Sequence, residues 1–369
     1  MRILAPHIDS FGGYGGIAAA NRHFLRAVCE VEAVEEVVAL PRVQPEAVGE
    51  SLPEALTWRT EGLGGKAAYV WALLRLLAMD RTFDAIWCGH IHLVPLAFIA
   101  KPFTGAPVTL HVHGIDAWTL RDRWLVDRLV PHVDAFISVS ETTKERLVDW
   151  SRLDPARGVV VPNTVDFDGL TPGPKPEVLL DRYGLHDRYV LMTMGRLAGK
   201  GRRKGFDRVL EALPSIADER PDVAYLIVGK GDDRPRLEQK AGRLGVRDRV
   251  TFAGYVPEVE KADHFRLADL FAMPSEGEGF GLVLLEALAC GTPVVASNRD
   301  GGREAVAGGD FGRLVDPTDS DAVAAALIDP PDVPPRSAVV DRFGPQAYRE
   351  RVKRIVRSMT ADGGQPTAV

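Results

Sequence analysis

Two glutamates flank a glycine-rich turn in the segment EGEGFGLVLLEALACGTPVVAS, residues 276–297. Glu278 precedes the turn, and Glu286 follows it after seven intervening residues, in a run whose pattern predicts a buried helix. A carboxylate one turn into a helix can accept two hydrogen bonds from a ribose diol, and one before the turn can reach a sugar hydroxyl. The free amides near Gly281 and Leu282 can hold phosphate oxygens. The segment therefore has the chemistry of a sugar-nucleotide site.

Each glutamate can also have a purely structural role, and for either residue considered alone that role is favoured over ligand binding. Glu286 can be a first-turn acid that complements the helix dipole, and Glu278 can be a solvated loop residue. The sugar-nucleotide hypothesis therefore needs support from other parts of the chain.

A second candidate segment is the loop GRLAGKGRRKGFD, which lies between a predicted strand and a predicted helix that begins near Phe206. Cations at such a place, beside glycines that permit close backbone approach, suit a phosphate or pyrophosphate. A solvated basic loop is the alternative, and the charge pattern alone does not decide between the two. The cations of this loop are Arg196, Lys200, Arg202, Arg203 and Lys204.

Short apolar runs alternate with amphipathic stretches along the chain, which is the pattern of parallel sheets covered by helices. Open α/β sheets bind ligands beyond the carboxyl ends of their strands, so the loops after the strands must position the site. The cationic loop and Glu278 both follow predicted strands. The predicted strands are 2–6, 34–40, 84–89, 107–113, 134–140, 158–163, 189–195, 223–229, 249–254, 270–275 and 292–297.

Length and composition favour two domains. A chain of 369 residues with 46% hydrophobic content can form two cores, and the stretch 163–185 is rich in Pro and Gly, as linkers are. We therefore predict an α/β fold with two Rossmann-like, doubly wound domains that face each other across a cleft. The first domain is residues 1–165, and the second is residues 166–344.

Charge and cysteine usage exclude several classes of protein. The net charge is −6 and the cations are scattered, so we predict no nucleic-acid binding. The three cysteines, Cys29, Cys88 and Cys290, match neither a disulfide framework nor zinc-ligand spacing, which indicates a reduced, cytoplasmic protein. The start has no signal-peptide pattern, and no apolar stretch reaches the roughly 20 residues of a membrane span.

The segment PSEGEGFGLVLLEALACGTPVVAS resembles the signature of the retaining glycosyltransferases of family 4, which have the GT-B fold. Further blocks resemble those of the family in the family's order, and the resemblance covers nearly the whole chain. It is weaker in the first half, where the family varies with its acceptors. These blocks are GGYGG, LHVHGIDAW, ISVSE, VPNTVD, MGRLAGKGRRKGFDRVLEAL, YLIVGKGDD, VTFAGYV, LFAMPS and DGGREAV.

The resemblance assigns roles in donor binding. It implies that Arg196 and Lys204 bind the donor diphosphate and that Glu286 holds the ribose. The donor sugar and phosphates are held by Glu278 together with the backbone of Phe280, Gly281 and Leu282. The cationic loop is longer than in many members, so Lys200 is an alternative to Lys204, which we prefer because GFD follows it as in the family.

The resemblance makes residues 1–165 the acceptor-side domain and residues 166–344 the nucleotide-sugar-binding domain, and it also assigns residues in the first domain. It implies that Gly15 and Gly16 close over the donor and that His113 stands near the reacting sugar. A histidine before a glycine is often only a hydrogen-bonded turn residue, and His111 competes with His113 on the same face. The last predicted helix, about 345–360, resembles the terminal helix that crosses back to the first domain.

The resemblance implies a retaining enzyme that moves a hexose from a UDP-sugar or GDP-sugar to an acceptor hydroxyl on a glycan, a lipid or a small molecule. We expect no cofactor and no metal, because arginine, lysine and helix amides already offset the leaving charge. The two Asp-x-Asp pairs, Asp166 with Asp168 and Asp319 with Asp321, have the spacing of another transferase fold and are interpreted as incidental.

Two alternatives remain open. One is a dinucleotide-dependent oxidoreductase, because Gly13, Gly15 and Ala18 fit G-x-G-x-x-A, although the next predicted strand ends before Arg42 and lacks the required acid. The other is a non-catalytic sugar-nucleotide-binding protein, or a phosphorylase of similar fold that uses free phosphate.

The stretch KAAYVWALLRLLAM offers a hypothesis about membrane contact. Its apolar stripe can rest on the inner face of a membrane that carries a lipid acceptor, or it can pack on its own sheet, which is the commoner case. Few cations flank it, whereas anionic lipids favour several. The stripe is Tyr69, Leu73, Leu76 and Leu77, with Lys66 and Arg75 at its edges.

Overall fold

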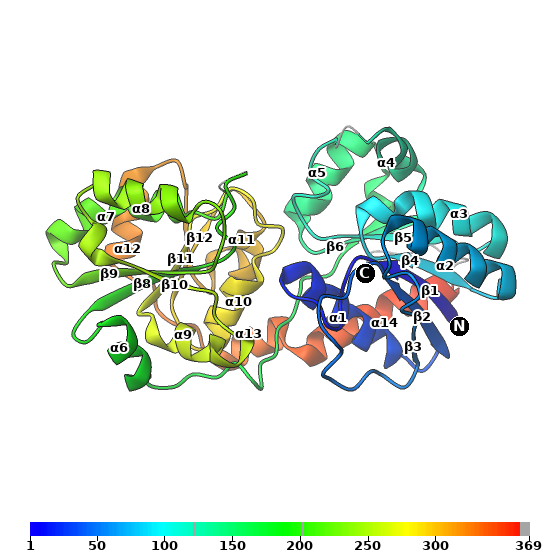
Figure 1. Ribbon diagram of the computed structural model, residues 1–369, viewed down its shortest axis with the longest axis horizontal. Helices are drawn as coiled ribbons and strands as arrows, with labels where there is room; N and C mark the ends of the chain where they lie inside the picture. The colour runs from blue at the N-terminus through cyan, green and yellow to red at the C-terminus, as the bar shows by residue number, and fades with distance from the viewer. Residues whose placement is uncertain (121–122, 201–202, 362–369) are drawn as a thin grey trace. The chain divides into compact units, whose positions relative to one another are not determined.

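The computed structural model describes residues 1–120, 123–200 and 203–361 (Figure 1). The chain divides into two compact units. The first unit is Met1–Thr164 with the C-terminal segment from Gln346, and the second unit is Val165–Pro345. The sequence analysis placed the boundary between the two domains after residue 165, one residue later than the structure does. No helix among the described residues combines the length and apolar character needed to cross a membrane.

The first unit is built on a parallel sheet of seven strands in the order β3-β2-β1-β4-β5-β6-β7. Its strands are continuous apolar runs because helices cover both faces of the sheet. The sequence predicted six of them and missed β3, a three-residue strand that pairs only with β2 at the sheet edge. The strands are β1 (Arg2–His7), β2 (Glu36–Pro41), β3 (Leu56–Trp58), β4 (Ala85–Cys88), β5 (Val108–Val112), β6 (Ala135–Ser138) and β7 (Gly158–Val160).

Two hydrophobic cores lie on opposite faces of this sheet. One contains α2 (Lys66–Met79), α3 (Val94–Thr104), α4 (Trp124–Leu129) and α5 (Glu141–Ser151), and the other contains α1 (Gly16–Cys29) and α14 (Pro345–Ala361). The last helix of the chain thus packs in the core of the first unit. It does so through Tyr348, Val352, Ile355 and Val356.

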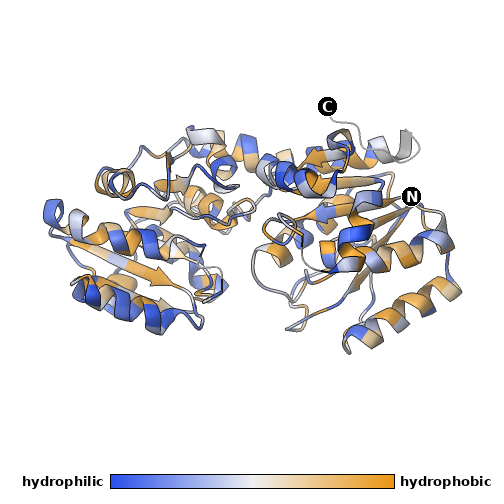
Figure 2. Ribbon diagram, turned by 90° about the horizontal axis from the view of Figure 1, so that it is seen from above, coloured by the Kyte–Doolittle hydropathy of each residue, from blue (hydrophilic) through white to orange (hydrophobic). Residues whose placement is uncertain are grey.

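The second unit has a parallel sheet of six strands in the order β10-β9-β8-β11-β12-β13. Figure 2 shows hydrophobic residues concentrated in strands and in one stripe of most helices. The sequence predicted five of these strands and missed β13, another three-residue edge strand. The strands are β8 (Tyr189–Met194), β9 (Val223–Val228), β10 (Val250–Gly254), β11 (Leu270–Met273), β12 (Val294–Ser297) and β13 (Arg313–Val315).

The segment predicted as a linker is not wholly irregular, because α6 forms within it, with Leu179 and Leu180 buried. That part of the interpretation was wrong. The helices of the second unit are α6 (Glu177–Tyr183), α7 (Phe206–Glu219), α8 (Arg234–Arg243), α9 (Lys261–Leu267), α10 (Leu282–Ala289), α11 (Gly302–Ala305), α12 (Ser320–Ile328) and α13 (Arg336–Phe343).

Candidate functional site

Three neighbouring strands of the second unit, β8, β11 and β12, carry the main candidate residues on the loops that follow them. The Lys204 loop (195–205) follows β8, the Glu278 loop (274–281) follows β11, and the Asp300 loop (298–301) follows β12. Parallel strands end at the same edge of a sheet, so the three loops meet there. Residues 201 and 202 of the Lys204 loop, including the predicted cation Arg202, lie outside the described residues.

The Lys204 loop and the Glu278 loop are joined through their backbones. The Glu276 N–H donates to the Arg203 carbonyl oxygen at 2.8 Å. Gly205 has a φ of +82°, and a Cβ there would lie 2.8 Å from the Pro274 carbonyl oxygen, so only glycine fits between the loops. This close approach fixes the position of Lys204, the residue before Gly205, relative to the Glu278 loop.

Lys204 and Glu278 form an ion pair, in which Lys204 Nζ bonds Glu278 Oε1. Glu278 is only 7% exposed, so it is not the solvated loop residue of the purely structural interpretation. Lys200 is exposed and makes no described side-chain hydrogen bond or ion pair. The structure therefore brings Lys204, rather than Lys200, together with Glu278.

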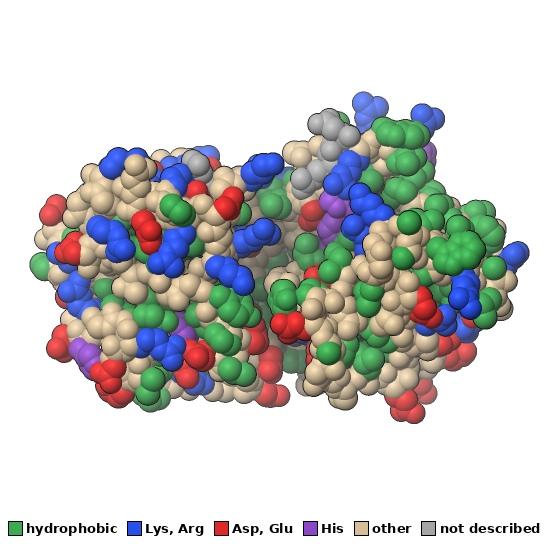
Figure 3. All heavy atoms as spheres, viewed as in Figure 1, with side chains coloured by type: hydrophobic (Ala, Val, Ile, Leu, Met, Phe, Trp, Pro, Cys, Tyr) green, Lys and Arg blue, Asp and Glu red, His purple; other side chains and the backbone are tan. Residues whose placement is uncertain are grey.

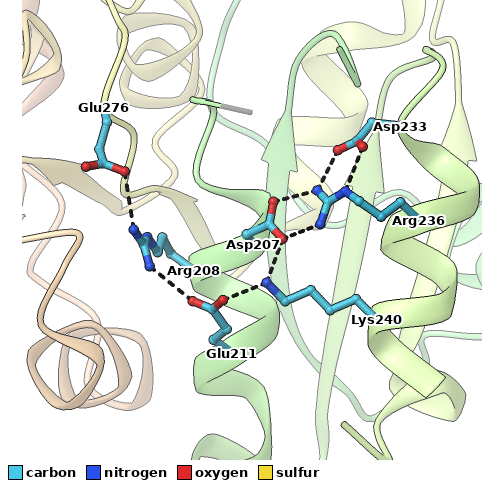
Figure 4. A network of polar contacts seen from close by, with 7 residues as sticks. All are labelled: Asp207, Arg208, Glu211, Asp233, Arg236, Lys240 and Glu276. Atoms are coloured by element: carbon cyan, nitrogen blue, oxygen red, sulfur yellow. Dashed lines mark hydrogen bonds and ion pairs between the residues drawn. The ribbon is translucent and has the colours of Figure 1, made fainter. Parts of the chain in front are cut away.

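A charged network behind these loops connects two helices to the Glu278 loop (Figure 4). Arg236 and Lys240 on α8 bond Asp207 on α7 at 2.6 to 2.7 Å, and Lys240 also bonds Glu211. Burial alone raises the pKa of Asp207, but hydrogen bonds from these two cations lower it to about 2, so the carboxylate stays charged. A weaker contact, from Arg208 to Glu276 at 3.4 Å, extends the network to the loop.

Asp300 lies beneath the Glu278 loop, and the sequence analysis gave it no role. Its buried side chain accepts hydrogen bonds from the Ser275 hydroxyl and from the Gly277 and Glu278 amides. Burial, assisted by the charge of Glu278, raises its pKa to about 6, although hydrogen bonds from the Glu278 amide and Ser275 oppose the shift. The sequence signal that could have identified Asp300 is an acid three residues after a predicted strand and directly before two glycines.

Glu286 is the fifth residue of α10 and is 8% exposed. Lys261 on α9 donates to its Oε1 at 2.6 Å, while Oε2 is buried and has no hydrogen-bond partner among the described residues. Burial raises the pKa of Glu286, and the Lys261 ammonium opposes that shift. A buried acid with one unpartnered oxygen does not fit the interpretation as a solvated helix-dipole acid. Lys261 was missed, because nothing in sequence spacing connects it to Glu286.

The other donor-binding candidates of the second unit lie on the same loops. Arg196 follows β8, is exposed, and bonds no described residue through its side chain. Phe280 is buried and packs edge-on against Phe343, with ring centroids 5.8 Å apart. Gly281 precedes α10, and Leu282 is its first residue. Phe280 thus anchors the turn, while the guanidinium of Arg196 remains available for a ligand.

His113 lies directly after β5 in the first unit, and its Nε2–H donates to the Gly89 carbonyl oxygen at 3.1 Å. Burial lowers its pKa to about 4, so the ring is neutral at pH 7. With the proton on Nε2, Nδ1 can only accept, and it has no partner among the described residues. His111 is buried inside β5 against Phe24, with ring centroids 5.0 Å apart, and it does not reach the surface.

Gly15 and Gly16 form the start of α1 and are exposed. Gly13 and Ala18 lie beside them, but β2 ends at Pro41, so no acid occupies the place that a dinucleotide ribose requires. The geometry gives the oxidoreductase hypothesis no support beyond the glycine spacing.

The aspartate pairs considered as metal ligands have local structural roles. Asp166 Oδ1 accepts the Asp168 and Gly169 amides in a turn, and Asp319 caps α12 by accepting the Ala322 amide at 3.0 Å. Throughout residues 1–120, 123–200 and 203–361, no three His, Cys, Asp or Glu side chains are grouped closely enough to hold a metal ion.

Two family matches cover most of the chain. Residues 14–168 match the family described as Glycosyltransferase Family 4, and residues 181–330 match Glycosyl transferases group 1. The chain is 33% identical to the GDP-mannose-dependent alpha-(1-6)-phosphatidylinositol monomannoside mannosyltransferase of Mycolicibacterium smegmatis over 286 residues, 73% of each chain. It is 37% identical over 210 residues to the D-inositol 3-phosphate glycosyltransferase of Geodermatophilus obscurus, which covers 54% of this chain and 46% of that one.

Solved structures share the fold at low sequence identity. HepE of Anabaena in complex with UDP and glucose has a TM-score of 0.74 and 19% identity, covering 97% of this chain and 100% of that one. Sucrose-phosphate synthase of Thermosynechococcus elongatus has a TM-score of 0.78 and 20% identity, covering 98% and 99%.

Proposed function

Because this chain belongs to the family 4 glycosyltransferases and has their α/β GT-B fold, we propose that it is a retaining hexosyltransferase that uses a nucleoside diphosphate sugar. The observation that carries this proposal is that Arg196 and Lys204 follow β8, that Lys204 pairs with Glu278 after the neighbouring strand β11, and that Glu286 lies on the helix after the Glu278 loop. Cations suit the diphosphate, and carboxylates suit hydroxyl groups of the ribose and the sugar.

We propose GDP-mannose as the donor, since the relative that matches 73% of the chain is named for its dependence on that donor. The unpartnered Oε2 of Glu286 supports ribose binding, because a buried carboxylate oxygen gains stability from a hydroxyl donor. Lys261 holds the other oxygen and thereby fixes the direction in which Oε2 points.

The chemistry proposed for these residues is charge stabilisation and positioning, without a metal ion. Arg196 and Lys204 offset the charge that develops on the leaving diphosphate. Glu278 orients the hexose, and a front-face route, in which the leaving phosphate accepts the proton of the acceptor hydroxyl, retains the anomeric configuration. His113 is neutral, so its Nδ1 contributes a hydrogen-bond acceptor for a hydroxyl rather than a positive charge.

For the acceptor we propose a hydroxyl of an inositol phosphate compound, free or lipid-linked. The names of both relatives contain inositol, one in a phosphatidylinositol mannoside and the other in D-inositol 3-phosphate. A lipid acceptor requires that the protein reach a membrane surface.

The stripe first considered for membrane contact cannot provide it, because those residues are in the core. Tyr69, Leu73, Leu76 and Leu77 are buried, and the Tyr69 hydroxyl donates to the Leu40 carbonyl oxygen at 2.7 Å. Other apolar side chains are exposed on α2, on α3, which packs against α2, and on α4, which packs against α3. Figure 3 shows hydrophobic side chains over these helices. This exposed apolar patch consists of Trp71, Leu74, Met79, Ile99, Phe103, Trp124 and Leu125.

We propose that the exposed apolar patch makes peripheral contact with the cytoplasmic face of a membrane. Trp71 is 68% exposed and Trp124 is 71% exposed, and tryptophan favours the membrane–water interface. The double change Trp71→Ser and Trp124→Ser is expected to lower affinity for phosphatidylinositol-containing vesicles about tenfold or more, as measured by co-sedimentation. Val259→Ser, which removes a 90% exposed apolar residue of the second unit, is the control and should leave sedimentation unchanged. Equal sedimentation of all three proteins would refute this contact.

The donor assignment is tested by calorimetry with GDP, UDP, ADP and NAD. We expect GDP to bind more tightly than UDP or ADP, and NAD not to bind. Preference for UDP would replace the proposed donor, and binding of NAD alone would restore the oxidoreductase hypothesis. GDP binding without turnover of any GDP-sugar would favour the non-catalytic binder.

A further inference from the structure

Asp300 is an unusual carboxylate because it is fully buried and is held by hydrogen bonds rather than by a cation. Its Oδ2 accepts the Ser275 hydroxyl at 2.7 Å, the Glu278 amide at 2.9 Å and the Gly277 amide at 3.0 Å. Its Oδ1 accepts the Gly302 amide at 3.0 Å. No Lys or Arg side chain pairs with it among the described residues. Burying a charge is costly unless hydrogen bonds compensate for the lost water. These four donors supply that compensation for Asp300.

Three of these donors belong to the Glu278 loop, and the loops are also joined by their backbones. The Gly301 amide donates to the Glu278 carbonyl oxygen at 2.9 Å. A Cβ at Gly301 would collide with the carbonyl oxygen of Gly279, so the two main chains are in direct contact. The amide of Glu278 is bonded to Asp300 and its carbonyl to Gly301, which leaves its main chain little freedom to rotate.

The Glu278 side chain is thus fixed from both ends. Its main chain is held by the Asp300 loop, and its carboxylate is held by Lys204. If Lys204 turns toward a bound diphosphate, as the proposed function requires, its hold on the Glu278 carboxylate weakens when the sugar must be oriented. From then on the backbone bonds to Asp300 are what direct Glu278.

We propose that Asp300 is a positioning residue for the donor sugar, which sets the main chain of Gly277 and Glu278 so that the Glu278 carboxylate meets the hexose. This inference rests on the proposed function. Asp300 has no contact with the donor in this scheme, and its effect passes through the loop. Misplacement of a catalytic group by about 1 Å can reduce a rate on the order of a hundredfold.

The test compares Asp300→Asn with a milder variant, Ser275→Ala, and with a structural control, Asp269→Asn. The amide has the same shape, but its NH2 group must face either the three donors at Oδ2 or the Gly302 amide, so at least one hydrogen bond is lost. Ser275→Ala removes one donor and leaves both loop amides bonded. Asp269→Asn is the matched structural control, because Asp269 accepts the Val190 amide at 2.8 Å and Lys175 Nζ at 2.6 Å, at the opposite end of the strands.

Four measurements are made on each protein: affinity for GDP, affinity for GDP-mannose, turnover, and hydrogen exchange of the 275–281 segment. In Asp300→Asn we expect GDP affinity within about threefold of wild type, while the difference between GDP-mannose and GDP affinity disappears and turnover falls about tenfold or more. Exchange at Gly277 and Glu278 should accelerate. Ser275→Ala should show the same changes more weakly, and Asp269→Asn should show none of them even where it lowers the melting temperature.

The possible failures are distinguishable. A wild-type protein that binds neither GDP nor GDP-mannose overturns the proposed donor, and one that also binds no UDP or UDP-sugar overturns the proposed function itself. A wild type that binds both, with an Asp300→Asn variant whose sugar-dependent affinity and turnover are unchanged, overturns only the role of Asp300. Equal losses of GDP and GDP-mannose affinity would also overturn it, because they would show general damage to the site. If Asp300→Asn does not fold, normal sugar-dependent affinity and normal exchange in Ser275→Ala would overturn the role.

Discussion

Arg196→Ala is expected to impair nucleotide binding and sugar transfer together, with the larger loss in transfer. The guanidinium is exposed and bonds no described residue, so the change should leave the melting temperature unaltered. A lost hydrogen bond to a charged group weakens GDP binding by about 1.5 to 3 kcal/mol. Transfer should fall on the order of a further tenfold, because the charge on the diphosphate grows as the bond breaks. Calorimetry and a GDP-release assay measure the two effects.

Lys200→Ala is the matched control for this prediction. Lys200 lies on the same loop and is exposed, but it is not the lysine that bonds Glu278. Its removal should leave GDP affinity and turnover within about twofold of wild type. If Arg196→Ala binds GDP normally while Lys200→Ala does not, the assignment of the diphosphate site along this loop is wrong.

Glu278→Ala and Glu286→Ala are expected to divide the two parts of donor recognition. Loss of Glu286 removes the ribose contact and should weaken binding of bare GDP by about 1.5 to 3 kcal/mol, which is roughly 10- to 150-fold in Kd. Loss of Glu278 frees Lys204 for the diphosphate, so bare GDP should bind as well as before or slightly better. Turnover of Glu278→Ala should nevertheless fall on the order of a hundredfold, because the hexose is no longer oriented.

Glu276→Gln controls for the general loss of an acid from the Glu278 loop. Its side chain contacts Arg208 only at 3.4 Å and is well exposed, so affinity and turnover should stay near wild type. Equal losses of GDP affinity in the Glu278 and Glu286 variants would contradict the division of roles. Unchanged affinity and turnover in both variants would mean that Glu278 and Glu286 have only structural roles.

The strand and helix pattern could be predicted because most elements are long enough to show their period. The eleven predicted strands are all present, whereas β3 and β13 have three residues each and lie at sheet edges, where they pair with one neighbour only. Neither segment lies in a longer apolar run, whereas β7, which is equally short and also lies at an edge, was predicted from the run GVVVPN. The helix α6 was missed because it is short and follows several prolines, which favour a linker prediction.

The apolar stripe of α2 shows why one helix alone does not reveal which side faces outward. Leu73 and Leu77 are buried, whereas Trp71 and Met79 on the same helix are exposed. The helix is apolar on most sides, so its sequence does not distinguish core from surface. Only packing against the sheet decides it.

The site was predictable where its residues share one segment and was missed where partners come from different segments. Glu278 and Glu286 attract notice because they flank one turn. Lys261 and Asp300 come from other elements, and their bonds to Glu286 and to the Glu278 loop depend on tertiary contacts. A single sequence contains no measure of those distances.

The most direct test of the proposed activity is to incubate the full chain with GDP-mannose and vesicles that contain phosphatidylinositol monomannoside. Nuclear magnetic resonance then identifies the products and the anomeric configuration of the new linkage. We expect GDP to appear in step with a mannosylated lipid whose new anomeric centre keeps the configuration of the donor. We expect the same result in the presence of a metal chelator. A product of inverted configuration would contradict retention. Full stability of GDP-mannose and of UDP-sugars alike, with every acceptor supplied, would contradict the assignment as an active glycosyltransferase.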